Sequence, residues 1–287
     1  MKRSNVFLAT TAILSLATTT VMAQSLGNIS ADVKIGLGVI NNMDGGFGLE
    51  SYSGIEDALT RGTFALDSSF GMSAGAGLLQ FDLNAEAFAT PSSDDDDATS
   101  YLVDIGVHYS RPVATMEIGG FVGVGIHDDN GDSDDAMGYW FAGIEARKNT
   151  SFGQIFGAIG YFDSYDEYNE GTQNAIFVRA GADYNLNEQT SLMGALGYSA
   201  GDKSFSALDN TTITLELGAE RQFSDTLSGF VSYQLDQVYF DASGTNYGDT
   251  FHTLTVGVHF GFGGGSHSTW STPDFGRWVA FNANEIE

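Results

Sequence analysis

Residues 79–87 read LQFDLNAEA, and this stretch decides the fold because apolar and polar side chains alternate through it without a break. Leu79, Phe81 and Leu83 begin the apolar series, and Gln80 and Asp82 begin the polar one. Successive side chains of a β-strand point to opposite faces, so this segment has one apolar face and one polar face. We therefore expect a strand that separates an apolar environment from water.

The same alternation recurs from residue 29 to residue 262, which predicts about twelve strands of ten or more residues. They are expected near 29–40, 62–72, 76–89, 100–110, 114–126, 137–147, 151–162, 175–185, 190–200, 211–221, 226–239 and 250–262. The connections alternate between long ones, near 41–61, 90–99, 127–136, 163–174, 201–210 and 240–249, and short ones, near 73–75, 110–113, 148–150, 186–189 and 222–225. This pattern is typical of an all-β, closed, antiparallel up-and-down transmembrane barrel with long extracellular loops and short periplasmic turns.

Residues 1–23 have the features of a secretory signal peptide. Lys2 and Arg3 precede an apolar run over 6–16, and small residues over 21–23 suit cleavage before Gln24. The apolar run is shorter than the ~20 residues that a transmembrane helix needs. We expect export of the chain, with the barrel over 24–262 and a short periplasmic tail over 263–287.

Composition and charge narrow the possible functions. The chain has 37 glycines and no cysteine, and its formal net charge is −26. Phosphate binding requires a basic surface, so nucleic acid is excluded as a partner. The mean hydropathy of −0.07 resembles that of a soluble protein, as expected when lipid-facing and lumen-facing residues cancel.

No catalytic motif stands out in the sequence. There is no phosphate-binding loop or dinucleotide fingerprint, and no two histidines have zinc-ligand spacing. His252 is the one candidate base on an outward face, but no serine lies beside it in a recognisable motif. His108 and His259 are expected in the lumen as ordinary polar residues. We expect no enzyme, no catalytic residue and no cofactor.

The final predicted strand carries a motif. Gly257 is followed after two residues by Phe260, and Phe262 ends the strand. In this the chain resembles bacterial outer-membrane β-barrel proteins, with a porin-like architecture over 24–262. The resemblance implies an outer-membrane location in a Gram-negative bacterium, with lipid and lipopolysaccharide as neighbours. It also implies that Gly257, Phe260 and Phe262 form the signal read by the barrel-assembly machinery. The family usually ends at this phenylalanine, whereas the present chain continues to Glu287.

The polar faces of the strands would line the lumen and set the selectivity of a channel. Inward-facing charges are expected at Asp32, Lys34, Asp82, Glu86, Asp104, Glu117, Glu145, Arg147, Arg179, Asp183, Glu216, Glu220 and Asp236. Their acidic excess predicts a porin-like channel for passive diffusion of small hydrophilic solutes with a preference for cations. In the alternative, the charges pair inside a filled interior, and the protein is a non-conducting structural or surface-interaction barrel. The sequence identifies neither the solute nor the oligomeric state.

Two further groups of residues belong to the ends of the barrel. Acidic clusters in the expected loops either form solvated, self-repelling segments or bind Ca²⁺ or Mg²⁺ weakly, and their spacing does not follow the EF-hand. They comprise Asp94, Asp95, Asp96, Asp97, Asp128, Asp129, Asp132 and Asp134. Aromatic residues near strand ends are expected to form interfacial girdles. They are Tyr52, Tyr101, Tyr109, Tyr139, Trp140, Tyr161, Tyr184, Tyr198 and Tyr239.

Overall fold

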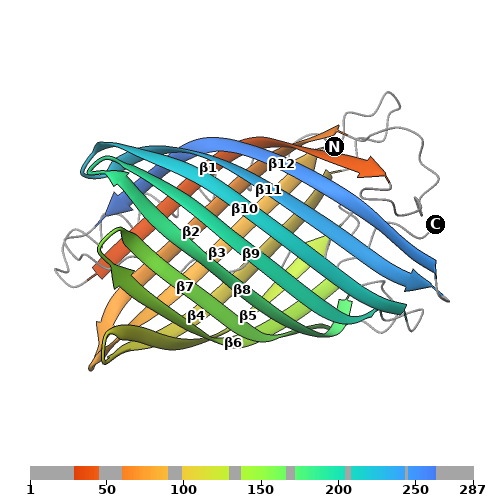
Figure 1. The fold of residues 1–287 in the computed structure, drawn as a ribbon, viewed down its shortest axis with the longest axis horizontal. Coiled ribbons are helices and arrows are strands. Elements are labelled where there is room, and N and C mark those ends of the chain that lie inside the picture. Colours follow the sequence, from red (N-terminus) through yellow and green to blue (C-terminus); the bar gives the residue numbers. More distant parts are fainter. Residues whose placement is uncertain are drawn as a thin grey trace, which may run out of the picture.

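The computed structural model describes residues 29–44, 60–89, 99–128, 137–165, 172–203, 208–242 and 245–262. They form twelve strands in one sheet, each antiparallel to its neighbours in the chain, and β12 pairs with β1 to close the barrel (Figure 1). The strands are β1 (Ile29–Asp44), β2 (Thr60–Ala74), β3 (Gly77–Ala89), β4 (Thr99–Val113), β5 (Met116–Asp128), β6 (Met137–Thr150), β7 (Gly153–Ser164), β8 (Thr172–Asn187), β9 (Thr190–Lys203), β10 (Leu208–Ser224), β11 (Leu227–Ala242) and β12 (Thr245–Phe262). The predicted closed, antiparallel, up-and-down barrel is confirmed.

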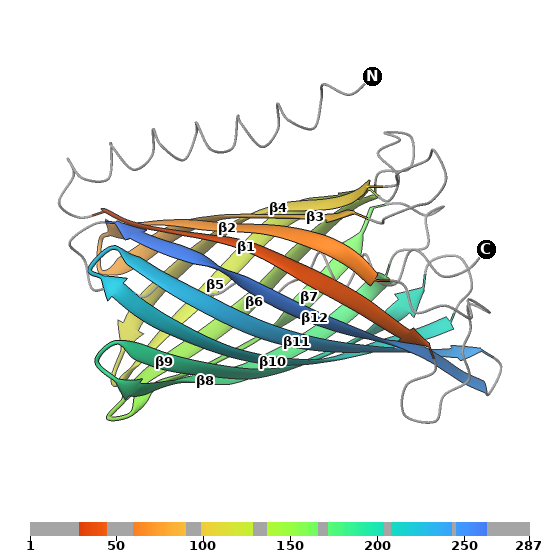
Figure 2. The ribbon, with the colours of Figure 1, turned by 90° about the horizontal axis from the view of Figure 1, so that it is seen from above.

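The closing pair fixes the two ends of the barrel. Ala31 pairs with Phe262, so β1 begins and β12 ends at the same rim, the one that carries the short turns. Figure 2 shows β1 and β12 side by side along the barrel, with all strands tilted to its axis. We call this rim the short-turn end and the opposite rim the long-loop end. The proposed signal peptide, the tail over 263–287 and most of the acidic loop residues lie outside the described residues.

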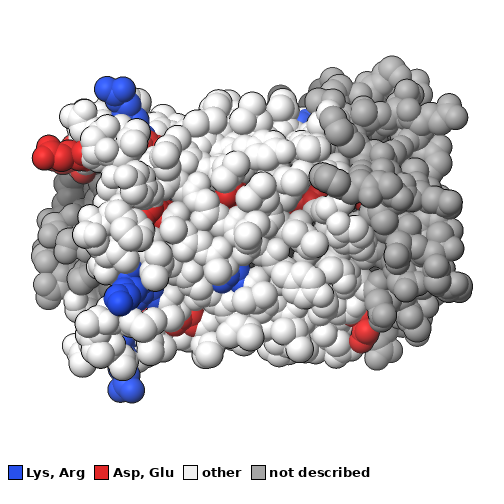
Figure 3. Space-filling view, viewed as in Figure 1, with Lys and Arg blue, Asp and Glu red and all other residues white. Residues whose placement is uncertain are grey.

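The outside of the barrel is apolar. Alternation turns Leu37, Val122, Ile176 and Val256 outward, each more than half exposed. The space-filling view shows few charged atoms across the middle of the barrel, with basic groups near the short-turn end (Figure 3). So large an exposed apolar surface is expected where lipid rather than water covers it. In the part of the chain that the structure describes, no helix is long and apolar enough to cross a membrane.

Two predicted short connections are misplaced. The turn between β6 and β7 lies at residues 151–152 and not at 148–150. The turn between β4 and β5 lies at residues 114–115, where Ala114 has a φ of 54°, and not at 110–113. Pro112 was read as part of the turn, but it lies in β4 opposite Glu117. A proline near the end of a strand removes only one hydrogen-bond donor from the ladder, so the strand continues past it. The strand of β5 accordingly starts at Met116 rather than near residue 114.

Inward-facing glycines let large side chains lie flat against the wall. A Cβ atom at Gly125 of β5 would lie 2.1 Å from Cζ of Tyr139, and one at Gly123 would lie 2.1 Å from Cζ of Phe141. Both rings belong to β6 and cross over β5 where no side chain stands in the way. Glycine inside a strand often marks such a close approach.

This arrangement also corrects one assignment in the expected aromatic girdles. Tyr139 faces the lumen and is fully buried, so it does not belong to an interfacial girdle. Tyr109, Tyr184 and Tyr198 lie on the outward face with nearly half of their surface exposed, as the girdle prediction requires. Tyr52 lies outside the described residues.

Candidate functional site

The half of the lumen toward the long-loop end contains buried apolar side chains beside buried polar ones such as Asp104 and Asp236. Two groups of buried, inward-facing side chains occupy it. The aromatic cluster comprises Phe121, Met137, Tyr139, Phe141, Phe162, Ala175 and Phe177 on β5–β8. The loop-end cluster comprises Ile40, Phe88, Leu102, Val238 and Phe251 on β1, β3, β4, β11 and β12. Neither cluster is predicted by the alternation, which indicates a uniformly polar inward face.

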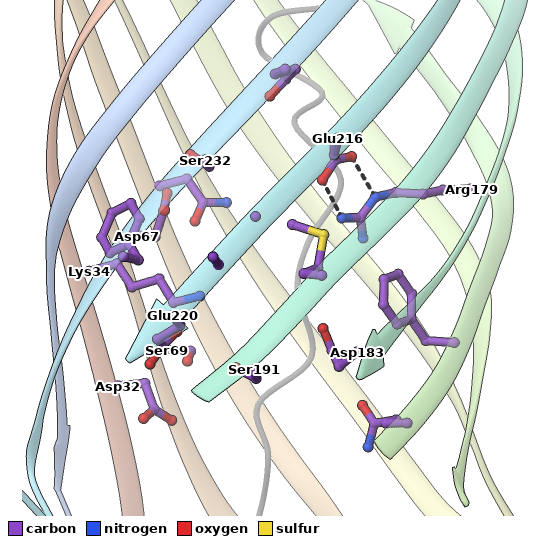
Figure 4. Close-up of a pocket in the computed structure, with 18 of the residues that line it drawn as sticks. Asp32, Lys34, Asp67, Ser69, Arg179, Asp183, Ser191, Glu216, Glu220 and Ser232 are labelled. Atoms are coloured by element: carbon purple, nitrogen blue, oxygen red, sulfur yellow. Dashed lines mark hydrogen bonds and ion pairs between the residues drawn. The ribbon is translucent and has the colours of Figure 1, made fainter. Parts of the chain in front are cut away.

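A charged cavity of about 380 Å³ occupies the centre of the lumen and the half toward the short-turn end. Its walls come from nearly the whole circumference of the barrel, from β1–β3 and β6–β11. Figure 4 shows acidic side chains and Lys34 directed into this space from several strands. A second cavity of about 120 Å³ lies beside it, toward the long loops, and is lined by β1–β4, β11 and β12. We call the larger one the main cavity.

Every charged residue predicted for the lumen occupies an inward-facing position in its strand. Those that line the main cavity are Asp32, Lys34, Asp82, Glu145, Arg147, Arg179, Asp183, Glu216 and Glu220. Glu86 and Asp104 line the second cavity. Glu117 is bound to Arg147, and Asp236 is fully buried toward the long-loop end. Sequence reasoning did not name the inward carboxylates Asp67 and Asp249, although both lie in the correct phase of the alternation.

Both arginines that line the main cavity are paired with carboxylates. Arg179 of β8 reaches across β9 to Glu216 of β10, with Nε 2.8 Å from Oε1 and Nη2 2.6 Å from Oε2 (Figure 4). Its guanidinium also lies over the ring of Phe156, 5.0 Å from the centroid. Arg147 donates from Nε to Glu117 at 2.8 Å. A bidentate guanidinium–carboxylate pair is among the strongest charge-assisted contacts. Because both arginines are paired with glutamates, they present little free positive charge to a solute.

Each of two lumen histidines lies between two carboxylates. His108 has Nε2 2.7 Å from Asp82 and Nδ1 2.8 Å from Glu145. His259 has Nδ1 2.7 Å from Glu220 and Nε2 3.2 Å from Asp32. A neutral imidazole has only one N–H to donate. Each group therefore makes both hydrogen bonds only when an additional proton resides on the ring or on a carboxyl.

These histidines were expected in the lumen, and they lie there, but their carboxylate partners were not foreseen. Glu145 of β6 reaches His108 of β4 across β5, where Gly119 leaves room for it: a Cβ there would lie 3.0 Å from Oε1 of Glu145. Such a contact between non-adjacent strands depends on register and on one missing side chain. Among the described residues, no group of three or more His, Asp or Glu side chains has the arrangement of a metal site.

The remaining candidates lie on the wall itself. Gly257 faces inward, and a Cβ there would lie 2.1 Å from the backbone oxygen of Ile35, while Phe260 and Phe262 stack with centroids 6.4 Å apart. Their proposed role in assembly stays a prediction. His252, the candidate base, has Nδ1 2.7 Å from the hydroxyl of Tyr233.

A closed antiparallel barrel with an apolar exterior and a charged lumen has the architecture of transmembrane β-barrels. No family model matches the chain, and no curated protein matches its sequence. Its structure is similar to an outer membrane channel from Pseudomonas putida F1, with a TM-score of 0.56 and 13% identity over 83% of this chain and 96% of that one.

Two further solved structures are similar at a lower level. They are the translocator domain of the autotransporter NalP from Neisseria meningitidis and the outer membrane channel DcaP of Acinetobacter baumannii. Their TM-scores are 0.45 and 0.43, each at 11% identity; the matches cover 88% and 82% of this chain, and 97% and 96% of the other chains. At these values the resemblance carries no argument. The similarity to the Pseudomonas putida channel concerns the fold alone.

Proposed function

We propose that the protein is an outer-membrane channel that lets small hydrophilic solutes pass by diffusion and prefers cations. The observation that carries this proposal is the main cavity, in whose wall seven carboxylates outnumber three basic side chains. The fold that it shares with an outer membrane channel of Pseudomonas putida F1 supports the same role and an outer-membrane location. No catalytic residue or cofactor is part of this proposal.

The preference for cations follows from the charge that remains after pairing. Arg147 and Arg179 are each held by a glutamate, whereas acids outnumber Lys and Arg among the described inward-facing residues. An anion that enters the lumen meets a negative electrostatic potential. The low-dielectric walls of the barrel focus this potential into the lumen, so anions are disfavoured. The buried apolar side chains of the long-loop half leave less room for water and ions, so the conductance per channel should be small.

Planar-bilayer recording across a KCl gradient tests this proposal. We expect discrete conductance steps with a reversal potential near that of K⁺. Asp183→Asn, which removes one carboxylate from the cavity wall, should shift the reversal potential toward that of Cl⁻. Asp183 belongs to no ion pair described above, so the variant should fold. A reversal potential near that of Cl⁻ in the unaltered protein would contradict the proposal.

A second function is favoured by one specific observation, the burial of both apolar groups in the lumen. If these side chains fill the long-loop half completely, the protein is a structural or surface-interaction barrel. The same recordings separate the two functions. Folded protein that inserts into the bilayer but never conducts would favour the closed barrel.

A further inference from the structure

One of the buried carboxylates in the long-loop half of the lumen lies beside the loop-end cluster. Asp249 of β12 faces inward and is fully buried. Its register partner on β11 is Val238, a member of the loop-end cluster, and Phe251 of the same cluster is the next inward residue on β12. Among the described residues, neither carboxylate oxygen of Asp249 has a hydrogen-bond partner.

The neighbouring Asp236 is a carboxylate in the same region that does have hydrogen-bond donors. Asp236 of β11 is the register partner of Phe251 and is also fully buried. It accepts hydrogen bonds from Thr214 Oγ1 at 2.6 Å and from Gln234 Nε2 at 3.0 Å. The fold therefore supplies donors to one of these two buried acids and leaves the other without them.

Within the described strands, further buried oxygen atoms without hydrogen-bond partners face the lumen on β10, two strands from Asp249. Thr212 of β10 is the register partner of Val238, so Thr212, Val238 and Asp249 form one inward-facing row across three strands. Asn210 is the next inward residue on β10. Thr212 Oγ1 and Asn210 Oδ1 are buried and, in the part of the chain described, have no hydrogen-bond partner. All these groups offer oxygen, the ligand atom that hard cations prefer.

We propose that Asp249 is the cation-binding and selectivity position of the long-loop half of the channel. A cation leaving the water on one side is held there by the carboxylate, with Thr212 and Asn210 replacing part of its hydration shell. A buried carboxylate without partners strongly favours a counter-ion. In apolar surroundings the same charge repels anions over a longer distance than it would in water. This inference rests on the proposed channel function and names the residue that gives it selectivity.

The test compares two isosteric substitutions, Asp249→Asn and Asp236→Asn, in the full-length protein. In planar bilayers across a KCl gradient, Asp249→Asn should lower the cation-to-anion permeability ratio roughly tenfold. Asp236→Asn removes a carboxylate of equal burial that already has donors, so it should change the ratio less than about twofold.

A binding measurement gives a second readout that does not require conduction. The unfolding temperature in detergent is compared in K⁺, in Ca²⁺ and in N-methylglucamine at constant ionic strength. The unaltered protein should be stabilised by K⁺ or Ca²⁺, and Asp249→Asn should abolish that shift. The separate K⁺ and Ca²⁺ measurements show whether the site holds a permeating monovalent ion or a resident divalent ion.

The outcomes separate this inference from the channel proposal. Conduction with unchanged selectivity in Asp249→Asn overturns the inference and leaves the channel intact. Equal stabilisation of the unaltered protein and of the variant by cations also overturns it. Loss of the cation-dependent shift in Asp249→Asn, in a protein that never conducts, supports the binding site and overturns the channel.

Discussion

The row of side chains that crosses β4, β5 and β6 gives a sharp prediction about packing. Gly106 of β4 and Gly123 of β5 are register partners and both face the lumen. A Cβ atom at Gly123 would lie 2.1 Å from Cζ of Phe141 and 2.5 Å from the backbone oxygen of Ile105. A Cβ atom at Gly106 would meet nothing closer than 3.8 Å. Substitution by alanine should therefore affect stability differently at these two register-paired positions.

The magnitudes follow from overpacking and from chain entropy. Gly123→Ala forces the ring of Phe141 off the wall and presses on a carbonyl that cannot move freely, which costs about 1–3 kcal/mol. Gly106→Ala meets only ordinary contacts and restricts the unfolded chain, so it should be neutral or stabilise by up to about 1 kcal/mol. We expect the two variants to differ by about 1–4 kcal/mol in the free energy of unfolding.

Urea unfolding in detergent micelles, followed by tryptophan fluorescence, measures this difference. The gel mobility of unheated samples confirms that each variant has folded before the titration. Equal stability of Gly123→Ala and Gly106→Ala would refute the reasoning, because it would mean that the ring of Phe141 does not lie across β5.

Three further outcomes are expected. Val256→Arg places a charge on the lipid-facing side of β12, where Val256 is 55% exposed, and should lower stability in vesicles by about 2–4 kcal/mol; an unchanged unfolding midpoint would show that this face does not contact lipid. Arg179→Gln frees the carboxylate of Glu216 and should raise the cation-to-anion permeability ratio, measured by reversal potential; a fall in that ratio would contradict the charge balance described above. Phe262→Ala should reduce the amount of folded barrel in the outer membrane of cells while leaving refolding in detergent unchanged, and a normal cellular yield would remove Phe262 from the assembly signal.

The strand pattern was predictable because a period of two leaves little ambiguity when one face contacts lipid. Leu79, Phe81 and Leu83 alternate so regularly with polar residues that the face of β3 follows directly from the sequence. Strand ends at the long loops were less predictable, since the strands extend beyond the apolar band and lose its periodicity. β12 starts at Thr245, for example, five residues before the apolar alternation suggests.

The filling of the lumen was not predictable from periodicity. Phe121, Phe141 and Phe177 occupy positions that alternation assigns to water, and they are buried because they pack on one another. One sequence feature could have predicted the filling of the lumen, namely inward phenylalanines that lie opposite inward glycines on the neighbouring strand. Gly143 lies opposite Phe121 in this way. This feature can be used only when the register between the two strands is known.

The charge partners in the site needed the three-dimensional register. Glu145 and His108 are separated by a whole strand, and the sequence contains no indication that Gly119 leaves the path between them open. Asp249 and Asp236 look alike in the sequence, and only their surroundings show that one has hydrogen-bond donors and the other has none. The acidic lumen could thus be inferred from the sequence, but the roles of individual acids could not.

The central claim is that one face of each strand contacts lipid and the other contacts a water-filled, acidic lumen. The chain has no cysteine, so single cysteines placed in liposome-embedded protein report directly on each face. Asn84 and Ala158 line the main cavity, whereas Leu83 and Ile159 are exposed on the outward face. We predict that a charged, water-soluble thiol reagent modifies cysteines at 84 and 158 and leaves those at 83 and 159 unmodified. Modification at 83 and 159 with protection at 84 and 158 would contradict the account.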